Sequence, residues 1–468
     1  MLKGIVSCVK HAASMSENTY YISSIEEGIP KINELKSAIV LNLGDRIEAQ
    51  LLGERIESAV IGDASFPDHL IKIRKHIPSL LAQRKKSIHD EIGSATANMQ
   101  GKLESAAKLL IEKLLLGAPI VVRFHNDADG ATGAYGLYLC LEQLSRRIAV
   151  TGFSKIQWKM HRGVAYSSSD AKEDMLTIGN YDSITRPLLL ITDFGTTDAS
   201  IDGTVLAKDK FDIIWLDHHP VLEQLAGMLD NYINPWMFGG NSNYTAGVLT
   251  CEFGKTFADV DLYLAEAASL IGDYSAYAQD DERAKDFALL LDMLTSDRRI
   301  AGPSASGDIT PYDIGMIMSD EARRDELIRY AKTRIEEAID SGLESIRQYK
   351  GALSQVYLLD FENVRKDTMT KYPLPGRYAS KLLERIEKVN EKPAILVLHF
   401  GHFVSVRVSD PIAEKANLLV TVNEIKSGYS YVDAAGGHNT AASIKLKQDE
   451  FKREIINALL RSFGCNIS

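Results

Sequence analysis

Four groups of acidic and histidine residues stand at or just beyond the ends of short predicted elements. In chain order they are His125 with Asp127 and Asp129, then Asp193, then Asp217 with His218 and His219, and finally Asp273. Carboxylates and imidazoles that crowd one crevice destabilise one another unless cations neutralise their charges. Mixed aspartate and histidine ligation suits Mn²⁺ or Mg²⁺ better than a metal that prefers thiolates. Two such ions sharing one carboxylate could activate water and clamp a phosphate for in-line attack.

The segments that carry these residues have the rhythm of strand, loop and helix. Residues 119–124, 188–192 and 211–216 are short, apolar and rich in β-branched residues, as strands buried on both faces are. Helical patterns separate them, which favours a doubly wound parallel sheet. Function in such a sheet collects outside the carboxyl ends of the strands, where three of the four groups would lie. A lone aspartate at a strand end is usually a cap, and a lone Asp-His-His is often a turn, but the whole set is hard to explain in that way.

The length of 468 residues predicts about three domains, on a prior of ~150 residues for each. The predicted parts are a β-rich module over residues 1–66, a helical connector over 67–117, a parallel-sheet α/β domain over 118–275, a charged helical linker over 276–350 and a smaller α/β domain over 351–468. The predicted fold class is therefore α/β, with two α/β domains joined by a long helix. For the β-rich module, a small barrel of the oligonucleotide-binding type is one candidate.

The composition narrows the class of protein. With 45% apolar and 25% charged residues the chain is typical of a folded globular protein, which excludes wholesale disorder. The net charge of -10 excludes a chain that coats nucleic acid over its whole surface, although a local basic cleft is compatible with it. The cysteines lie far apart, which excludes a cysteine zinc site and a disulfide framework. Without a visible targeting segment or an apolar run near ~20 residues, we expect a soluble cytoplasmic protein with no membrane partner.

The order HNDADG, ITDFG, WLDHHP and LIGD resembles the four motifs of the DHH phosphoesterase superfamily. This group contains RecJ nucleases, oligoribonucleases and family II pyrophosphatases. Near the C-terminal end, the run AGGH followed by NTAAS resembles the Gly-Gly-His element of the associated, DHHA1-type domain. The resemblance covers residues 118–275 and 351–468, and the two elements in this order are highly specific.

The resemblance implies a role for each residue of the four groups. The implied metal ligands are His125, Asp127, Asp129, Asp193, His218 and Asp273, with Asp193 as the bridge between two ions. His219 would help to hold the metal-activated water or the phosphate, and Asp217 would orient an imidazole without binding metal itself. The spacing His-x-Asp-x-Asp differs from that of the pyrophosphatases, because Arg123 occupies the position of their more distant histidine. The spacing is similar to that of archaeal RecJ-like proteins.

A second set of residues is implied in the smaller domain. Ser405 and Arg407 stand two residues apart on a predicted strand and so share one face. They resemble the Ser-x-Arg element that meets nucleotide phosphate. Gly436 and Gly437 would let the backbone approach a phosphate closely, while His438 would donate a hydrogen bond to a non-bridging oxygen.

The function implied by the resemblance is a metal-dependent exonuclease, like archaeal RecJ, that degrades single-stranded DNA or RNA from an end. Its cofactors would be two Mn²⁺ or Mg²⁺ ions, and its setting DNA replication, DNA repair or RNA turnover. One alternative is an oligoribonuclease or nucleotide phosphatase, although those relatives are usually little more than the two α/β domains. Another is a replication scaffold that binds the GINS complex and has lost catalysis. The intact acidic and histidine positions favour the enzyme, with GINS binding as a compatible second role.

Overall fold

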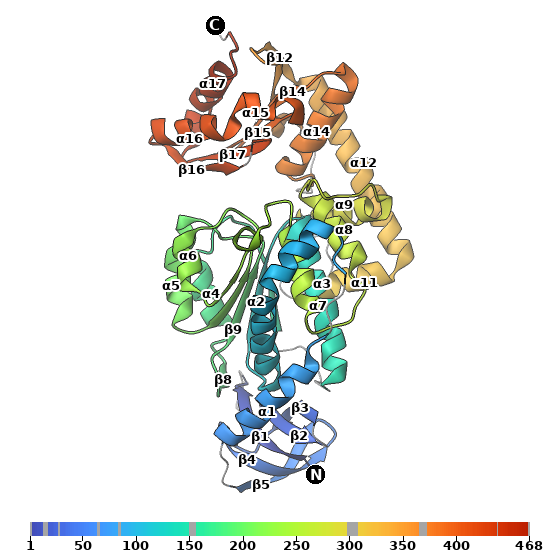
Figure 1. The fold of residues 1–468 in the computed structure, drawn as a ribbon, viewed down its shortest axis with the longest axis vertical. Helices are drawn as coiled ribbons and strands as arrows, with labels where there is room; N and C mark the ends of the chain where they lie inside the picture. Colours follow the sequence, from blue (N-terminus) through green and yellow to red (C-terminus); the bar gives the residue numbers. More distant parts are fainter. Residues whose placement is uncertain are drawn as a thin grey trace. The chain divides into compact units, whose positions relative to one another are not determined.

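The computed structural model describes residues 2–12, 17–26, 29–62, 66–82, 86–148, 156–296, 308–364, 372–437 and 439–466. The chain forms two compact units, Met1–Arg324 and Asp325–Ser468 (Figure 1). The predicted α/β class, with a parallel sheet and an N-terminal β-rich module, is confirmed. The finer division into five parts stays a prediction. Among the described residues, none of the helices combines the length and the apolar character that crossing a bilayer requires.

The N-terminal module is a small closed barrel. Its strands are β1 (Leu2–Lys10), β2 (Asn18–Glu26), β3 (Ile29–Ser37), β4 (Arg46–Leu52) and β5 (Arg55–Gly62). β1 pairs with both β2 and β4, and β3 pairs with β5, so that the sheet closes around buried side chains such as Val6 and Ile22. β1 also pairs with β8 (Tyr181–Ser183) of the parallel-sheet domain. Whether the barrel binds oligonucleotides stays a prediction.

The first unit is built around a five-stranded parallel sheet. The strand order is β11 (Asn231–Ile233), β10 (Asp212–Leu216), β9 (Leu188–Thr192), β6 (Ile120–His125) and β7 (Ile156–His161). The helices of this unit are α1 (Phe66–Leu80), α2 (Asp90–Leu115), α3 (Ala128–Arg147), α4 (Ser168–Thr177), α5 (Ile201–Lys208), α6 (Glu223–Met228), α7 (Ala246–Lys255), α8 (Tyr263–Gly272), α9 (Glu282–Ser296) and α11 (Pro311–Ser319).

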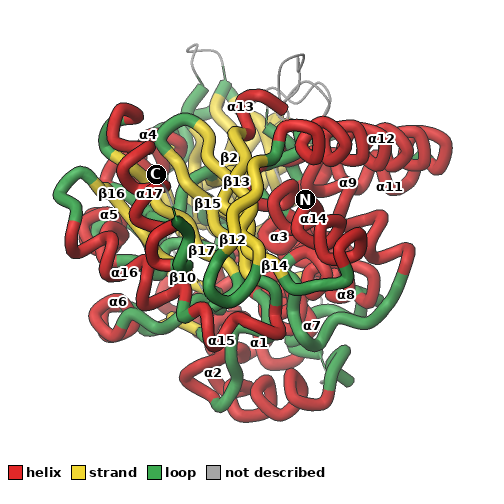
Figure 2. The backbone as a smooth tube through the Cα atoms, turned by 90° about the horizontal axis from the view of Figure 1, so that it is seen from above, coloured by secondary structure: helices red, strands yellow, loops and turns green. Residues whose placement is uncertain are grey.

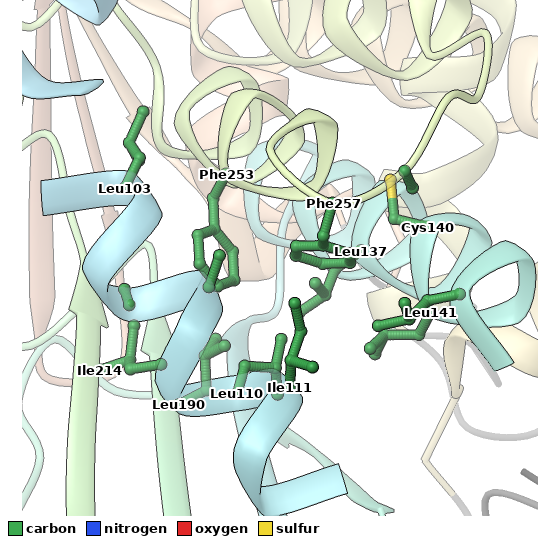
Figure 3. Packing of buried hydrophobic residues seen from close by; sticks show 14 of the residues in the cluster. Leu103, Leu110, Ile111, Leu137, Cys140, Leu141, Leu190, Ile214, Phe253 and Phe257 are labelled. Atoms are coloured by element: carbon green, nitrogen blue, oxygen red, sulfur yellow. The ribbon is translucent and has the colours of Figure 1, made fainter. Parts of the chain in front are cut away.

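Helices cover both faces of this sheet because its strands are apolar on both faces. Alternate residues of the strands, such as Leu190 and Ile214, pack with α2, α3 and α7 (Figure 3). Their neighbours, such as Leu189 and Trp215, pack on the other face with residues of α4, α5 and α6. The two apolar layers fix the sheet between the helices, so the loops at its carboxyl edge start from rigid elements.

The second unit has a six-stranded sheet in the order β12 (Arg347–Lys350), β13 (Gln355–Asp360), β14 (Ala394–Phe400), β15 (Phe403–Val408), β17 (Ala441–Leu446) and β16 (Val432–Gly437). Its central strands lie side by side in Figure 2. The helices are α12 (Glu321–Ser345), which begins in the first unit, α13 (Phe361–Val364), α14 (Pro375–Asn390), α15 (Ala413–Ala416), α16 (Leu418–Gly428) and α17 (Lys452–Ser462). Buried residues such as Val406, Leu418 and Ile455 form its core.

Candidate metal centre

The turn from β6 into α3 places the first group of predicted ligands. His125 ends β6, and Asp127 is the N-cap of α3, where its Oδ1 accepts a hydrogen bond from the Gly130 backbone N–H at 3.0 Å. A Cβ at Gly130 would stand 2.6 Å from the His125 carbonyl oxygen, so only glycine fits this close turn. His125 Nδ1 lies 2.7 Å from the other oxygen of Asp127. The capping aspartate therefore also fixes the imidazole.

Asp129 is held by the N-terminus of another helix. The backbone N–H groups of Ala246 and Gly247, at the start of α7, donate to its two carboxylate oxygens at 2.9 Å each. The Ser269 hydroxyl donates to the same carboxylate. Burial raises the pKa of Asp129 above its ordinary value, although nearby His218 acts in the opposite direction. A negative charge at a helix N-terminus is favourable, so α7 helps to keep this buried carboxyl in place.

Asp193 follows β9 in a strained conformation, with a φ of 68°. Its carboxyl is buried, and its Oδ2 has no hydrogen-bond partner among the described residues. Burial raises the pKa of Asp193 well above its ordinary value, and the carboxylates of Asp127, Asp129 and Asp273 raise it further. Burying a carboxylate oxygen without a hydrogen-bond donor raises the free energy of the folded state. This oxygen therefore fits a site that a bound cation completes.

The Asp-His-His segment after β10 sets two imidazoles in different ways. Asp217 is fully buried, and its Oδ1 lies 2.7 Å from His219 Nδ1. The Thr196 hydroxyl donates to the other oxygen of Asp217. Burial alone would raise the pKa of Asp217, but the charge and hydrogen bond of His219 outweigh it and lower this pKa. Burial lowers the pKa of His219, but the charge and hydrogen bond of Asp217 outweigh it and raise this pKa. Asp217 is thus placed to orient His219.

His218 is oriented by a backbone carbonyl. Its Nδ1 lies 2.9 Å from the carbonyl oxygen of Ser242, which can only accept, so Nδ1 carries the proton. Its Nε2 faces two other predicted ligands and lies 3.6 Å from Asp193 Oδ1 and 4.0 Å from Asp129 Oδ2. A histidine whose other nitrogen donates to a fixed acceptor is the usual arrangement of a metal ligand.

The predicted ligands and His219 converge in three overlapping groups, and within each group the ligand atoms lie within 4.8 Å of one another. They are His125, Asp127 and Asp193; Asp193, His218 and His219; and Asp129, His218 and Asp273. Asp193 belongs to two of the groups, as a bridging carboxylate would. Carboxylate oxygens and imidazole nitrogens are donors that suit Mn²⁺ or Mg²⁺. The residues present therefore fit the predicted metal site.

Arg123, which stands where the pyrophosphatases have a histidine, has a different role. Its guanidinium is buried and forms ion pairs with three acidic residues of α4, including Asp174 at 2.7 Å. Burial opposes the charge, but Asp174 and its acidic neighbours raise the pKa of Arg123, so it stays cationic. Arg123 thus ties β6 to α4.

Several residues that support the site carry no motif. Besides Ser269, they include Asp292 of α9, a buried residue whose Oδ1 accepts a hydrogen bond from the Ala128 backbone N–H at 3.0 Å. Ala128 stands between the two predicted ligands of the first turn of α3. Asp292 lies in the part predicted to be a linker helix, and the only signal was an aspartate inside the apolar run LLLDML.

The second unit places four predicted residues on β15 and β16, the two strands that flank β17. Arg407 Nη1 donates to the Ser405 hydroxyl at 3.0 Å, and its Nε donates to the Ser380 hydroxyl at 3.2 Å. Ser405 pairs in register with Ser443, which pairs with Gly436. Gly437 has a φ of 145°, and a Cβ there would stand 2.2 Å from a carbonyl oxygen. His438 lies outside the described residues.

Residues 119–267 match the family model described as the DHH family, N-terminal domain. Together with the arrangement of the site, this match supports a DHH-type domain over these residues. The match includes five of the predicted ligands, and Asp273 lies six residues beyond it.

Three known proteins show how far the similarity extends. An uncharacterized protein of Methanocaldococcus jannaschii is 25% identical over 432 residues, which are 81% of this chain and 56% of that relative, so the chain spans little more than half of it. A solved structure described as the DHH domain of a member of a family of ribosomal proteins is 20% identical, with a TM-score of 0.68, and covers 84% of this chain and 98% of its own. RecJ from Thermus thermophilus in complex with Mn²⁺ is 16% identical, with a TM-score of 0.49, over 83% of this chain and 60% of its own.

Asp193→Asn should raise the melting temperature of the metal-free protein by several degrees at neutral pH. Because the pKa of Asp193 is raised in the folded chain, the folded state binds this proton more tightly than the unfolded state. The resulting stability is complete below the unfolded pKa of ~3.9 and is lost as the pH rises through the folded pKa. The advantage of the variant should therefore grow with pH, which thermal unfolding in excess chelator measures.

Asp202→Asn, on the exposed surface of α5, is the matched control and should show no such dependence on pH. Added Mn²⁺ should stabilise the wild type and the control but not Asp193→Asn. Equal melting temperatures of wild type and Asp193→Asn in chelator at every pH would show that ionisation of the buried Asp193 carboxyl does not destabilise the folded state.

Asp292→Ala should weaken Mn²⁺ binding ~10–100-fold, because losing a group that positions ligands typically costs that much. Asp292→Asn keeps an acceptor for the Ala128 N–H and should recover most of the affinity. Isothermal titration of Mn²⁺ into the metal-free variants measures this. Thr295→Val is the control, since among the described residues this buried hydroxyl bonds only to carbonyls of its own helix. Normal affinity in Asp292→Ala would mean that α9 only packs against the site.

Proposed function

We propose that this protein is a two-metal phosphodiesterase that removes nucleotides from an end of single-stranded DNA or RNA. The observation that carries the proposal is the position of Asp193, which is shared between two ligand groups and keeps a buried oxygen without a partner among the described residues. One ion would be held by His125, Asp127 and Asp193, and the other by Asp193, Asp129, His218 and Asp273. Bound Mn²⁺ or Mg²⁺ ions acidify water and neutralise charge on phosphate.

The residues of the chain supply orientation and a proton. Asp217 accepts from His219 Nδ1, so the other nitrogen of this half-exposed imidazole is turned away from the carboxylate. Against the effect of burial, the charge and hydrogen bond of Asp217 raise the pKa of His219 and so favour the protonated ring, which can donate from Nε2 to a phosphate oxygen. His219 therefore binds the phosphate, while the strained turn at Asp193 and the N-terminus of α7 keep the carboxylates in position.

The second unit would hold the phosphates of the substrate strand. Arg407 is already fixed by two serine hydroxyls, so its guanidinium loses little freedom when it binds phosphate. Ser405, Gly436, Gly437 and His438 complete this set in the proposal. Metal ligands in one unit and separate phosphate-binding residues in the other suit a nucleic-acid strand better than a single nucleotide.

The cellular setting of this proposal is DNA replication, DNA repair or RNA turnover in the cytoplasm, with the GINS complex as a compatible partner. The alternative within the superfamily is an oligoribonuclease or nucleotide phosphatase. Single strands of DNA and RNA, labelled at either end and incubated with Mn²⁺, separate the two and give the polarity. Efficient hydrolysis of dinucleotides, equal to that of long strands, would favour the alternative.

Chelation should abolish hydrolysis, and Mn²⁺ should restore it at least as well as Mg²⁺. Asp129→Ala and His218→Ala should each lose more than ~10²-fold in kcat, because both remove a ligand atom from the same group. Circular dichroism should show that both variants remain folded. Asp202→Asn should keep full activity. Hydrolysis at the normal rate in excess chelator would refute the metal-dependent mechanism.

Arg407→Ala should act mainly on KM and flatten the salt dependence of binding, because a cation that positions phosphate contributes through released counterions. His438→Ala should lower kcat by ~10²–10³, as the loss of a donor to the charge on phosphate does. Single-turnover rates beside the content of bound Mn²⁺ separate these effects. Arg385→Ala is the control, since this arginine of α14 pairs with Glu336. If His438→Ala cleaves normally, the Gly-Gly-His element is structural.

A further inference from the structure

Two large exposed aromatic residues adjoin predicted metal ligands, one through a hydrogen bond and the other in the sequence. Trp236 is 44% exposed and stands in the short 3₁₀ helix Pro235–Phe238 after β11. Tyr274 is 48% exposed and follows the predicted ligand Asp273. Exposed apolar residues are common when scattered, so the question is whether the fold requires aromatic residues at these two positions.

Trp236 is tied to the Asp-His-His segment by hydrogen bonds. Its indole Nε1–H donates to the carbonyl oxygen of His218 at 2.9 Å. Its backbone N–H donates to Asn234 Oδ1, and the amide of Asn234 donates to the His219 carbonyl oxygen at 2.8 Å. The indole is thus anchored at one edge beside the two histidines while much of it stays open to solvent.

Tyr274 occupies a position that the backbone reserves for glycine. The helix α8 ends in a Schellman motif, in which the Ser275 N–H donates to the Leu270 carbonyl and the Tyr274 N–H to that of Ile271. Tyr274 is the left-handed residue of this motif, with a φ of 53°. Glycine or asparagine fits there without strain, whereas a bulky residue is an outlier. The backbone conformation alone therefore does not favour a tyrosine at this position.

We propose that Trp236 and Tyr274 are stacking surfaces for the nucleobases next to the scissile phosphate. The proposal rests on the proposed function and names the part of the substrate that these residues recognise. Strained residues persist where function selects them, and aromatic faces bind bases without regard to sequence. In a duplex the bases already stack on one another, so these surfaces favour single strands with unstacked ends.

The test compares oligothymidylate with the same strand carrying abasic residues at both ends. Binding is measured by fluorescence anisotropy with Mn²⁺ and phosphorothioate linkages, which slow hydrolysis. Tyr274→Asn and Trp236→Leu should each bind the normal strand about 5–100-fold more weakly, the effect that loss of one stacked base has. Both should bind the abasic strand as the wild type does, and Tyr274→Phe should behave as the wild type. Tyr274→Asn should also melt at the same or a higher temperature, because asparagine relieves the left-handed strain.

Tyr312→Leu, which removes an exposed tyrosine from α11, is the control and should change nothing. Equal binding of the normal strand by wild type, Tyr274→Asn and Trp236→Leu overturns the proposal, as does an equal loss for normal and abasic strands. The outcome is independent of catalysis. A wild type that binds bases through these residues but does not hydrolyse the unmodified strand refutes the proposed function alone, whereas hydrolysis without base-dependent binding refutes only the stacking.

Discussion

The like charges around Asp193 are the constraint on which the rest of the structure depends. Its carboxyl is buried, and the carboxylates around it raise its pKa together with burial. Such a cluster is unfavourable in a low-dielectric site unless cations or fixed donors compensate it. Repulsion between these carboxylates pushes them apart. If they are to be in position before an ion binds, other parts of the fold must hold them together.

Fixed dipoles of the backbone provide that restraint. The first turn of α3 binds the Asp127 carboxylate, and the first turn of α7 binds that of Asp129. Both helices keep their places because their apolar faces pack on one face of the parallel sheet. Helix N-termini stabilise negative charge without adding a mobile cation that would compete with a metal. Core packing on the sheet is thus what converts electrostatic repulsion into a preorganised set of ligands.

The ligands could be predicted from the sequence, whereas the groups that hold them in place could not. Asp127, Asp193 and His218 follow apolar strands, and parallel strands bring their carboxyl ends to one edge, so the convergence of these three ligands could be expected. The hydrogen-bond donors and acceptors that hold these ligands in place give no such signal. Backbone N–H groups such as those of Ala246 and Gly247 have no side-chain signature, and Asp292 reaches Ala128 across 164 positions of the chain. The strain at Tyr274 likewise appears only once the end of α8 is seen.

The barrel and the metal centre lie at opposite ends of β6. Gly117, just before this strand, packs so closely against the barrel that a Cβ there would stand 2.6 Å from Tyr21. The barrel strand β1 pairs with β8, which precedes β9 and so adjoins the same amino edge of the sheet. The predicted ligands follow the carboxyl ends, and β6 has 6 residues, a length of roughly 20 Å. The barrel therefore cannot supply a ligand to the ions. Under the proposed function, a single nucleic-acid strand that contacted both the barrel and the metal centre would have to extend over several nucleotides along the outside of the sheet and its helices.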